Sequence, residues 1–121
     1  MEEKIKEVLK YEGVFSIVAA GENFPHIANS WNSFTYYKDN QIFVPVGIMN
    51  KMQECLKKDN RVIVVIGTRD IEGLYGMGMG IKIFANAFIE DDTKEFEELK
   101  KRFEWARAIM RLEITDSYQT A

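Results

Sequence analysis

Short apolar runs separated by turn residues predict a domain built mainly from β-strands. The predicted strands cover residues 14–20, 27–37, 41–46, 61–67, 81–89 and 109–115. Apolar residues at helical spacing predict helices over 3–12 and 50–58, and a third helix opens near Asp92. Strands with three interspersed helices are typical of a predominantly antiparallel barrel with helices at its ends.

Glycine and turn residues set the expected boundaries of several elements. Gly13 is well placed to cap the first helix. The short turn at 38–40 predicts that strand 41–46 returns as a hairpin partner of the strand before it. The glycine-rich segment 73–80 is expected to be a loop between strands. It does not match a dinucleotide-binding motif, because Ile81 stands where a third glycine is needed and a strand follows instead of a helix.

The third helix gives Trp105 an unusual predicted position. Asp92 and Glu95 form a capping-box pattern at the start of this helix. Its apolar stripe consists of Phe96, Leu99, Phe103 and Ala106. At about 100° per residue, Trp105 falls off this stripe, and a large ring that points away from the core indicates a partner surface or a ligand. The alternative is that the helix ends before Trp105 and the ring folds against the domain.

Composition narrows the classes of function. The chain has 121 residues, which is enough for a single domain, 1–121, with its own core. A formal net charge of −3 argues against general nucleic-acid binding, which rewards a basic surface, but does not oppose a small anionic ligand. Cys55 is the only cysteine, so no intrachain disulfide is possible. With no signal-peptide pattern and no apolar run of membrane-spanning length, we expect a cytoplasmic protein.

The most informative segment is the polar stretch at 29–33. Asn and Ser are poor strand formers, yet they surround Trp31 inside a predicted strand. The two faces of such a strand would carry Asn29, Trp31 and Ser33 on one side and Ser30 and Asn32 on the other. Hydrogen-bonding groups on both faces and a flat ring suit a ligand with a planar part and a polar tail. The alternative is an edge strand whose polar groups face water.

A second segment indicates an anion site. Pro45, Val46 and Gly47 end a predicted strand, and the helix that carries Lys51 in its first turn follows at once. The first N–H groups of a helix lack partners and carry partial positive charge, to which Lys51 adds a full charge. A phosphate group would suit this place, and Gly47 would let the backbone approach a ligand closely. The alternative is that Lys51 is an ordinary solvated lysine.

The sequence contains no residue pattern that indicates a metal site or a catalytic nucleophile. His26 is the only histidine, and together with Cys55, which lies on an apolar helical stripe, it cannot build a metal site. No Gly-x-Ser-x-Gly motif is present, so a serine nucleophile is not indicated. We interpret His26 as an exposed turn residue and Cys55 as a buried, inert thiol.

Three ordered blocks of the sequence match a known family. They are Pro25-His26 to Trp31-Asn32-Ser33, Val44-Pro45-Val46-Gly47 with Met49 and Lys51, and Arg102-Phe103 with Trp105-Ala106-Arg107-Ala108, followed by Gln119-Thr120 near the end. In these blocks the chain resembles the small FMN-binding proteins of the split-barrel, pyridoxamine 5'-phosphate oxidase-like flavoprotein superfamily. The resemblance implies a mainly β, six-stranded antiparallel split barrel with Greek-key topology. It also implies a homodimer with FMN at the subunit interface.

The same resemblance implies a set of cofactor-binding residues. Those that would line the flavin are Asn29, Ser30, Trp31, Asn32 and Ser33, with Pro45, Val46 and Gly47 along the isoalloxazine and ribityl parts. Lys51 would hold the phosphate, beside Met52. Trp105 and the tail near Ala121 would reach the flavin of the other subunit. The departures from the family pattern are Phe34 in place of Tyr, Ile48 in place of Gly, Met52 in place of Thr and Ala121 in place of Leu.

These observations lead to three hypotheses about function. The first is a homodimeric FMN flavoprotein that carries electrons to or from a redox partner. The second is an enzyme of the same superfamily, either a flavin reductase or a pyridoxamine-phosphate-oxidase-like oxidoreductase. Arg107 and Arg111 lack the accompanying histidine that such oxidases are expected to carry, which counts against that substrate. The third is a non-flavin binding module whose polar strand serves only dimerisation. A related cofactor such as a deazaflavin would also fit the groove.

Overall fold

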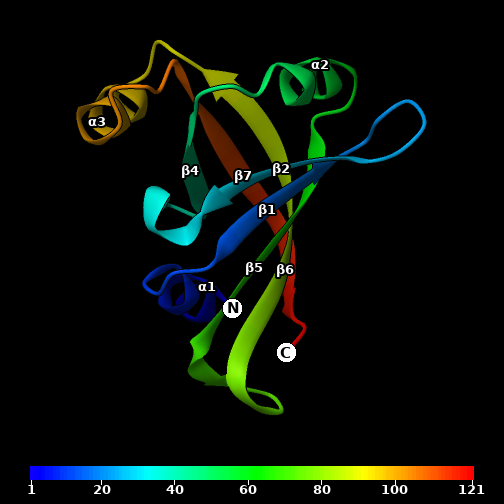
Figure 1. Ribbon diagram of the computed structural model, residues 1–121, viewed down its shortest axis with the longest axis vertical. Helices are drawn as coiled ribbons and strands as arrows, with labels where there is room; N and C mark the ends of the chain where they lie inside the picture. Colours follow the sequence, from blue (N-terminus) through cyan, green and yellow to red (C-terminus); the bar gives the residue numbers. More distant parts are fainter.

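The computed structural model describes residues 1–121 and contains one seven-stranded sheet and three α-helices (Figure 1). The strands are β1 Val14–Ala19, β2 His26–Trp31, β3 Tyr36–Lys38, β4 Gln41–Val46, β5 Arg61–Gly73, β6 Gly76–Glu90 and β7 Ala108–Gln119. Their order is β2-β1-β5-β6-β7-β4-β3, and every neighbouring pair is antiparallel. The expected mainly β, antiparallel fold class is confirmed. The strands number seven instead of six because the predicted strand 27–37 divides into β2 and β3.

The curled sheet surrounds a core made by alternate residues of its strands, since successive side chains of a strand face opposite sides. The buried residues of the central strands include Phe15, Ile17, Val64, Ile66, Ile81 and Ile83. Helix α1 (Glu2–Leu9) adds Ile5 and Val8 to this core. Helix α2 (Asn50–Lys58) adds Met52 and Leu56 at the upper end of the molecule in Figure 1. Helix α3 (Lys94–Arg102) lies at the same end. None of these helices is both long and apolar enough to cross a membrane.

Two predictions about glycines are wrong. Helix α1 ends at Leu9, and its C-cap is Lys10 rather than Gly13. Gly13 instead allows a close backbone approach, because a Cβ there would collide with the carbonyl oxygen of Gly67. The segment 73–80 is not a free loop, since β5 and β6 continue through it and form a long projecting hairpin (Figure 1).

The third helix also differs from the prediction at both ends. The side chain of Thr93, not Asp92, caps it, and Thr93 Oγ1 accepts a hydrogen bond from the N–H of Phe96 at 3.1 Å. The helix ends at Arg102, so Trp105 lies in the connection that leads to β7. The predicted helical position of Trp105 was therefore wrong, and its surroundings are set by the loop.

Candidate functional site

A pocket of about 660 Å³ lies where the ends of β2 and β4 meet the start of α2 and the connection between α3 and β7. Its walls are formed by Asn29, Ser30, Trp31, Phe34, Pro45, Gly47, Ile48, Met49, Trp105 and Arg107. The structure thus brings together six of the residues predicted from the sequence, namely Asn29, Ser30, Trp31, Pro45, Gly47 and Trp105. We call this the tryptophan pocket. Its volume falls within the range of roughly 300–1,000 Å³ that small-molecule sites occupy.

Aromatic rings make up one wall of the tryptophan pocket. The ring of Phe34 lies with its centroid 6.1 Å from that of Trp105, and the ring of Phe103 lies 4.8 Å from Phe34 and 5.5 Å from Trp105, so the three rings form one cluster. Trp105 is 52 % exposed and Trp31 is 47 % exposed, although each ring carries a large apolar surface. Exposed aromatic surface beside a pocket favours a ligand or a partner that would cover it.

Gly47 lets Trp105 approach the backbone at the floor of the pocket. A Cβ added at position 47 would lie 3.0 Å from Cε3 of the indole, which is tighter than an ordinary contact. Any larger residue at this position would displace the ring. The requirement for glycine therefore comes from the packing of Trp105 and not from an unusual backbone angle, because Gly47 has no positive φ.

The two uncharged polar side chains of the pocket, Asn29 and Ser30, come from β2, and their exposure alternates as predicted. Asn29 and Trp31 are exposed, while Ser30 between them is buried. The Ser16 hydroxyl donates a hydrogen bond to Asn29 Oδ1 at 2.8 Å. This contact directs the amide oxygen of Asn29 toward β1 and leaves its two N–H groups to donate to a ligand.

Asn32 lies in the core and does not line the pocket. β2 ends at Trp31, and Asn32 begins a short 3₁₀ turn. Its Nδ2 donates to the carbonyl oxygens of Tyr11 at 3.1 Å and Gly67 at 3.2 Å, and its backbone N–H donates to Gly13 O at 2.9 Å. Through these contacts the fully buried Asn32 holds the segment after α1, the 3₁₀ turn and β5 together.

Ser33 is also turned away from the pocket wall, toward the segment that follows α1. Its hydroxyl donates to Glu12 Oε2 at 2.7 Å, and its backbone N–H donates to Glu12 Oε1 at 3.2 Å. The hydrogen bond from the Ser33 hydroxyl is the main reason why the pKa of Glu12 lies below its ordinary value. Ser33 therefore bonds to Glu12 and does not form part of the pocket wall.

The remaining predicted residues lie outside the walls of the tryptophan pocket. Val46 and Met52 are fully buried in the core. Lys51 stands in the first turn of α2, as predicted, but its side chain lines a separate cavity of about 390 Å³ together with Lys58. Ala121 lies beside the β5–β6 hairpin, at the other end of the molecule from α2 (Figure 1).

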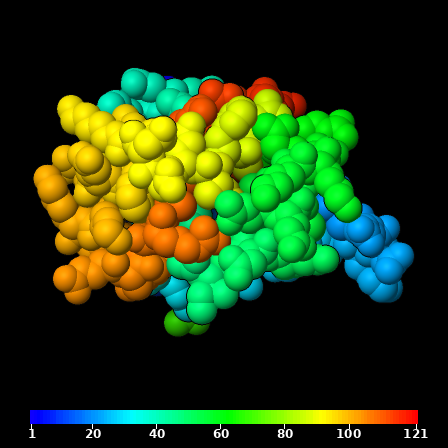
Figure 2. All heavy atoms as spheres, turned by 90° about the horizontal axis from the view of Figure 1, so that it is seen from above, coloured from blue at the N-terminus to red at the C-terminus, as the bar shows by residue number.

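Arg107 is a pocket residue that the site prediction from the sequence missed. Its Nε donates to Gly47 O at 2.7 Å, and its Nη2 donates to Gln53 Oε1 at 2.9 Å. It is the only charged side chain in the wall. Figure 2 looks onto this end of the molecule and shows the connection before β7, in orange, beside the start of α2, in green. The sequence signal was its place two residues before the last predicted strand and two residues after Trp105.

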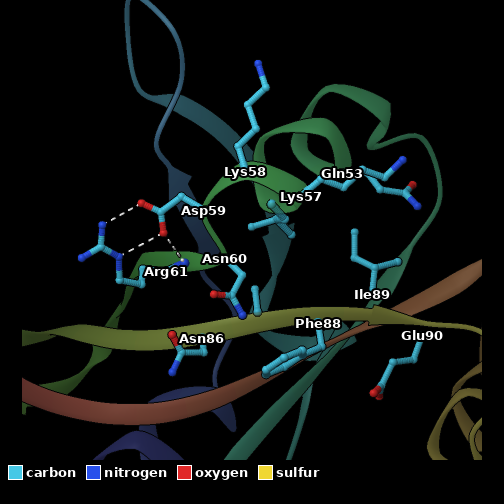
Figure 3. A pocket seen from close by; sticks show the side chains of 12 residues that line it. Gln53, Lys57, Lys58, Asp59, Asn60, Arg61, Asn86, Phe88, Ile89 and Glu90 are labelled. Carbon is cyan, nitrogen blue, oxygen red and sulfur yellow. Dashed lines mark hydrogen bonds and ion pairs between the residues drawn. The ribbon is translucent and has the colours of Figure 1, made fainter.

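A second, larger cleft of about 720 Å³ lies between α2 and β6 (Figure 3). Its acidic groups are already paired. Asp59 Oδ2 accepts a hydrogen bond from Arg61 at 2.7 Å, and the Arg61 guanidinium lowers the pKa of Asp59 to about 2. Its single aromatic ring, Phe88, lies under the guanidinium of Arg111 at 4.5 Å. This cleft therefore offers less free aromatic surface to a flat ligand than the tryptophan pocket does.

Comparison with known proteins identifies the family of the chain. The family model described as pyridoxamine 5'-phosphate oxidase matches residues 1–120. The chain is 42 % identical over 115 residues to the FMN-binding protein of Nitratidesulfovibrio vulgaris, covering 94 % of this chain and 93 % of that protein. Among solved structures, HupZ of Group A Streptococcus has a TM-score of 0.79 at 10 % identity, covering 99 % of this chain and 94 % of its own.

An FMN-binding protein of Syntrophomonas wolfei has a TM-score of 0.73 at 14 % identity, covering 98 % of this chain and 85 % of its own. At such low identity the solved structures show a shared fold only. The family model and the 42 % identical relative carry the assignment. The chain therefore belongs to the pyridoxamine 5'-phosphate oxidase family.

Proposed function

We propose that this chain is a flavoprotein that binds FMN in the tryptophan pocket and carries electrons as a homodimer. The observation that carries the proposal is the meeting of two half-exposed indole rings, Trp31 and Trp105, at one pocket beside the start of α2. The 42 % identical relative is named an FMN-binding protein, which supports the choice of cofactor. FMN would supply the redox chemistry, while the protein binds and orients it.

The pocket fits the flat part of FMN. Aromatic side chains provide stacking surface, and Gly47 lets the backbone come close to a planar ligand. The free N–H groups of Asn29 suit the carbonyl and hydroxyl oxygens of the ligand. The positive charge of Arg107 in the wall favours the negative charge that a flavin gains on reduction.

The phosphate of FMN would lie at the start of α2. No side chain caps this helix, so its first N–H groups remain available to an anion. The nearest ion-pair partner of Lys51 is Glu54 at 4.0 Å, and both side chains are well exposed. Lys51 has a long side chain that is weakly held, so it can turn toward a phosphate. A charge-assisted contact with the phosphate would be stronger than its present contact with Glu54.

The outer face of the sheet is the surface that would pair two subunits. Four of its apolar residues, Val14, Ile27, Val65 and Tyr118, are between 42 % and 57 % exposed. The strand register places Asn29, Ser16, Val65, Lys82 and Tyr118 in one row across this face. Trp31 lies on the same face, opposite Val14. A second copy seated here would therefore cover the open side of the tryptophan pocket.

Electron transfer is favoured over acid–base catalysis by the composition of the pocket. Its walls contain no carboxylate, imidazole or thiol, and Arg107 is the only charged group. A reaction that moves protons on a substrate usually needs a side chain with an accessible pKa in the site. A flavin reductase is the second candidate, because hydride transfer to the flavin makes less use of such a group.

Titration of the flavin-free protein with FMN and with riboflavin tests the proposal. We expect saturable binding of FMN at one per chain and weaker binding of riboflavin, which lacks the phosphate. A steady-state assay with NADH and free flavin then separates the two candidates. Sustained NADH consumption would favour the reductase, and the absence of FMN binding would contradict both.

A further inference from the structure

Arg107 connects three parts of the chain at the mouth of the tryptophan pocket. Its backbone N–H donates to Val46 O at 2.9 Å, at the end of β4. Its Nε donates to Gly47 O at 2.7 Å, in the loop that follows. Its Nη2 donates to Gln53 Oε1 at 2.9 Å and to Asn50 Oδ1 at 3.3 Å, both on α2. One side chain thus links the strand end, the loop and the first turns of the helix.

The loop that Arg107 holds forms part of the pocket wall. It runs from Gly47 to Met49, and Ile48 at its tip is 95 % exposed. Trp105 packs on Gly47 from one side, and Arg107 holds the Gly47 carbonyl. All the contacts of the Arg107 side chain end on neutral oxygen atoms. These hydrogen bonds, and not an ion pair, account for its placement.

We propose that Arg107 is a positioning residue for the cofactor, an inference that rests on the proposed function. It holds Gly47 and Trp105, which face the ring, at a constant distance from the start of α2, which faces the phosphate. Lysine would keep the charge but lose the planar fork that contacts both the loop and the helix. Without the fork, the loop and α2 move independently and the two ends of FMN no longer find their partners together.

Two readouts test this role, with R107K and R107Q as variants and R61Q as a matched control. Arg61 is an exposed arginine that pairs with Asp59 in the other cleft. In a W31F background Trp105 is the only tryptophan, so acrylamide quenching reports directly on the packing of the loop. We expect both Arg107 variants to increase this quenching in the flavin-free protein, while R61Q leaves it unchanged.

The second readout is the dissociation constant of FMN in chains that keep both tryptophans. We expect R107K and R107Q each to raise it about tenfold, as for the loss of a charged hydrogen bond, and R61Q to leave it unchanged. Adding Q53A to R107Q should change the dissociation constant no further, because each substitution removes the same contact between Arg107 and Gln53. Wild-type affinity in R107K would overturn the proposal, since charge alone would then suffice. A lowered melting temperature with unchanged quenching and affinity would also overturn it.

The two hypotheses fail separately. If the unmodified protein does not bind FMN, the proposed function fails, while the quenching of Trp105 still decides whether Arg107 positions the loop. If the unmodified protein binds FMN and neither Arg107 variant affects quenching or affinity, the positioning role fails and the proposed function stands.

Discussion

Asn32 donates a hydrogen bond from Nδ2 to the carbonyl oxygen of Gly67, at 3.2 Å across the core. The same nitrogen also donates to Tyr11 O at 3.1 Å. This residue was predicted as a flavin contact, and the structure gives it a second purpose in holding the fold. N32A should lower the free energy of unfolding by about 1–3 kcal/mol, because it leaves the partly buried carbonyl groups of Tyr11 and Gly67 without this donor.

Urea unfolding of the flavin-free protein measures this loss, and S33A serves as the control because Ser33 bonds at the surface to Glu12. We expect S33A to lower the free energy of unfolding much less than N32A does. Weaker FMN binding by N32A with unchanged stability would instead assign Asn32 to the cofactor site.

Position 47 should be sensitive to a single methyl group. In G47A the new Cβ would press against the indole of Trp105, and overpacking of this kind costs about 1–3 kcal/mol. Because that ring faces the pocket, we expect this cost to appear as weaker FMN binding. In a W105A background the additional effect of G47A should disappear. An equal effect of G47A in both backgrounds would show that Trp105 is not the residue it displaces.

Lys51 should contribute to FMN binding but not to riboflavin binding. K51A removes a charge-assisted contact to the phosphate, so it should weaken FMN binding by about 1.5–3 kcal/mol. K57A is the matched control, since Lys57 lies on the same helix beyond its first turn. Isothermal titration with both ligands measures the difference. An FMN affinity that K51A leaves unchanged would place the phosphate elsewhere.

Acid should remove the contribution of Glu12 to stability. Its pKa is lowered in the folded protein, chiefly by the hydroxyl of Ser33, so folding favours the charged form. That contribution is complete above the ordinary value of 4.5 and is lost as the pH falls through the lower folded pKa. The stability difference between wild type and E12Q should therefore shrink over the pH range below 4.5. A difference that stays constant over this range would contradict the role of the carboxylate.

A charge in the middle of the exposed sheet face should separate the subunits. Val65 is 42 % exposed and lies in the central row of that face. V65D would bring two like charges together in a symmetric pair, which should raise the dimer dissociation constant at least about a hundredfold. Analytical ultracentrifugation measures this, with Y11D, in the segment that follows α1, as a control. A dimer that withstands V65D would place the interface on another surface.

The sequence predicts the fold class well because strand patterns depend on local alternation, which long-range contacts rarely reverse. Prediction from the sequence fails where a residue distant in the chain determines the local structure. Nothing near Asn32 in the sequence reveals that Tyr11 and Gly67 would draw its amide inward and end β2. In the same way, Gly13 resembles a helix cap until the close approach of Gly67 is known.

Of the residues predicted for the site, the structure brings together those that are unusual in their own segment. Trp31 and Gly47 stand out in the sequence and both line the tryptophan pocket. Arg107 was missed because arginines are common at surfaces, and its importance comes from three acceptors far away in the sequence. Lys51 was found in its predicted turn, but a residue pattern cannot give the direction of a flexible side chain.

The visible absorption spectrum of the purified protein, with mass spectrometry of any released cofactor, decides whether this chain carries FMN. We expect a yellow protein that releases FMN at close to one per chain. A colourless protein that also fails to bind added FMN would contradict the proposed function.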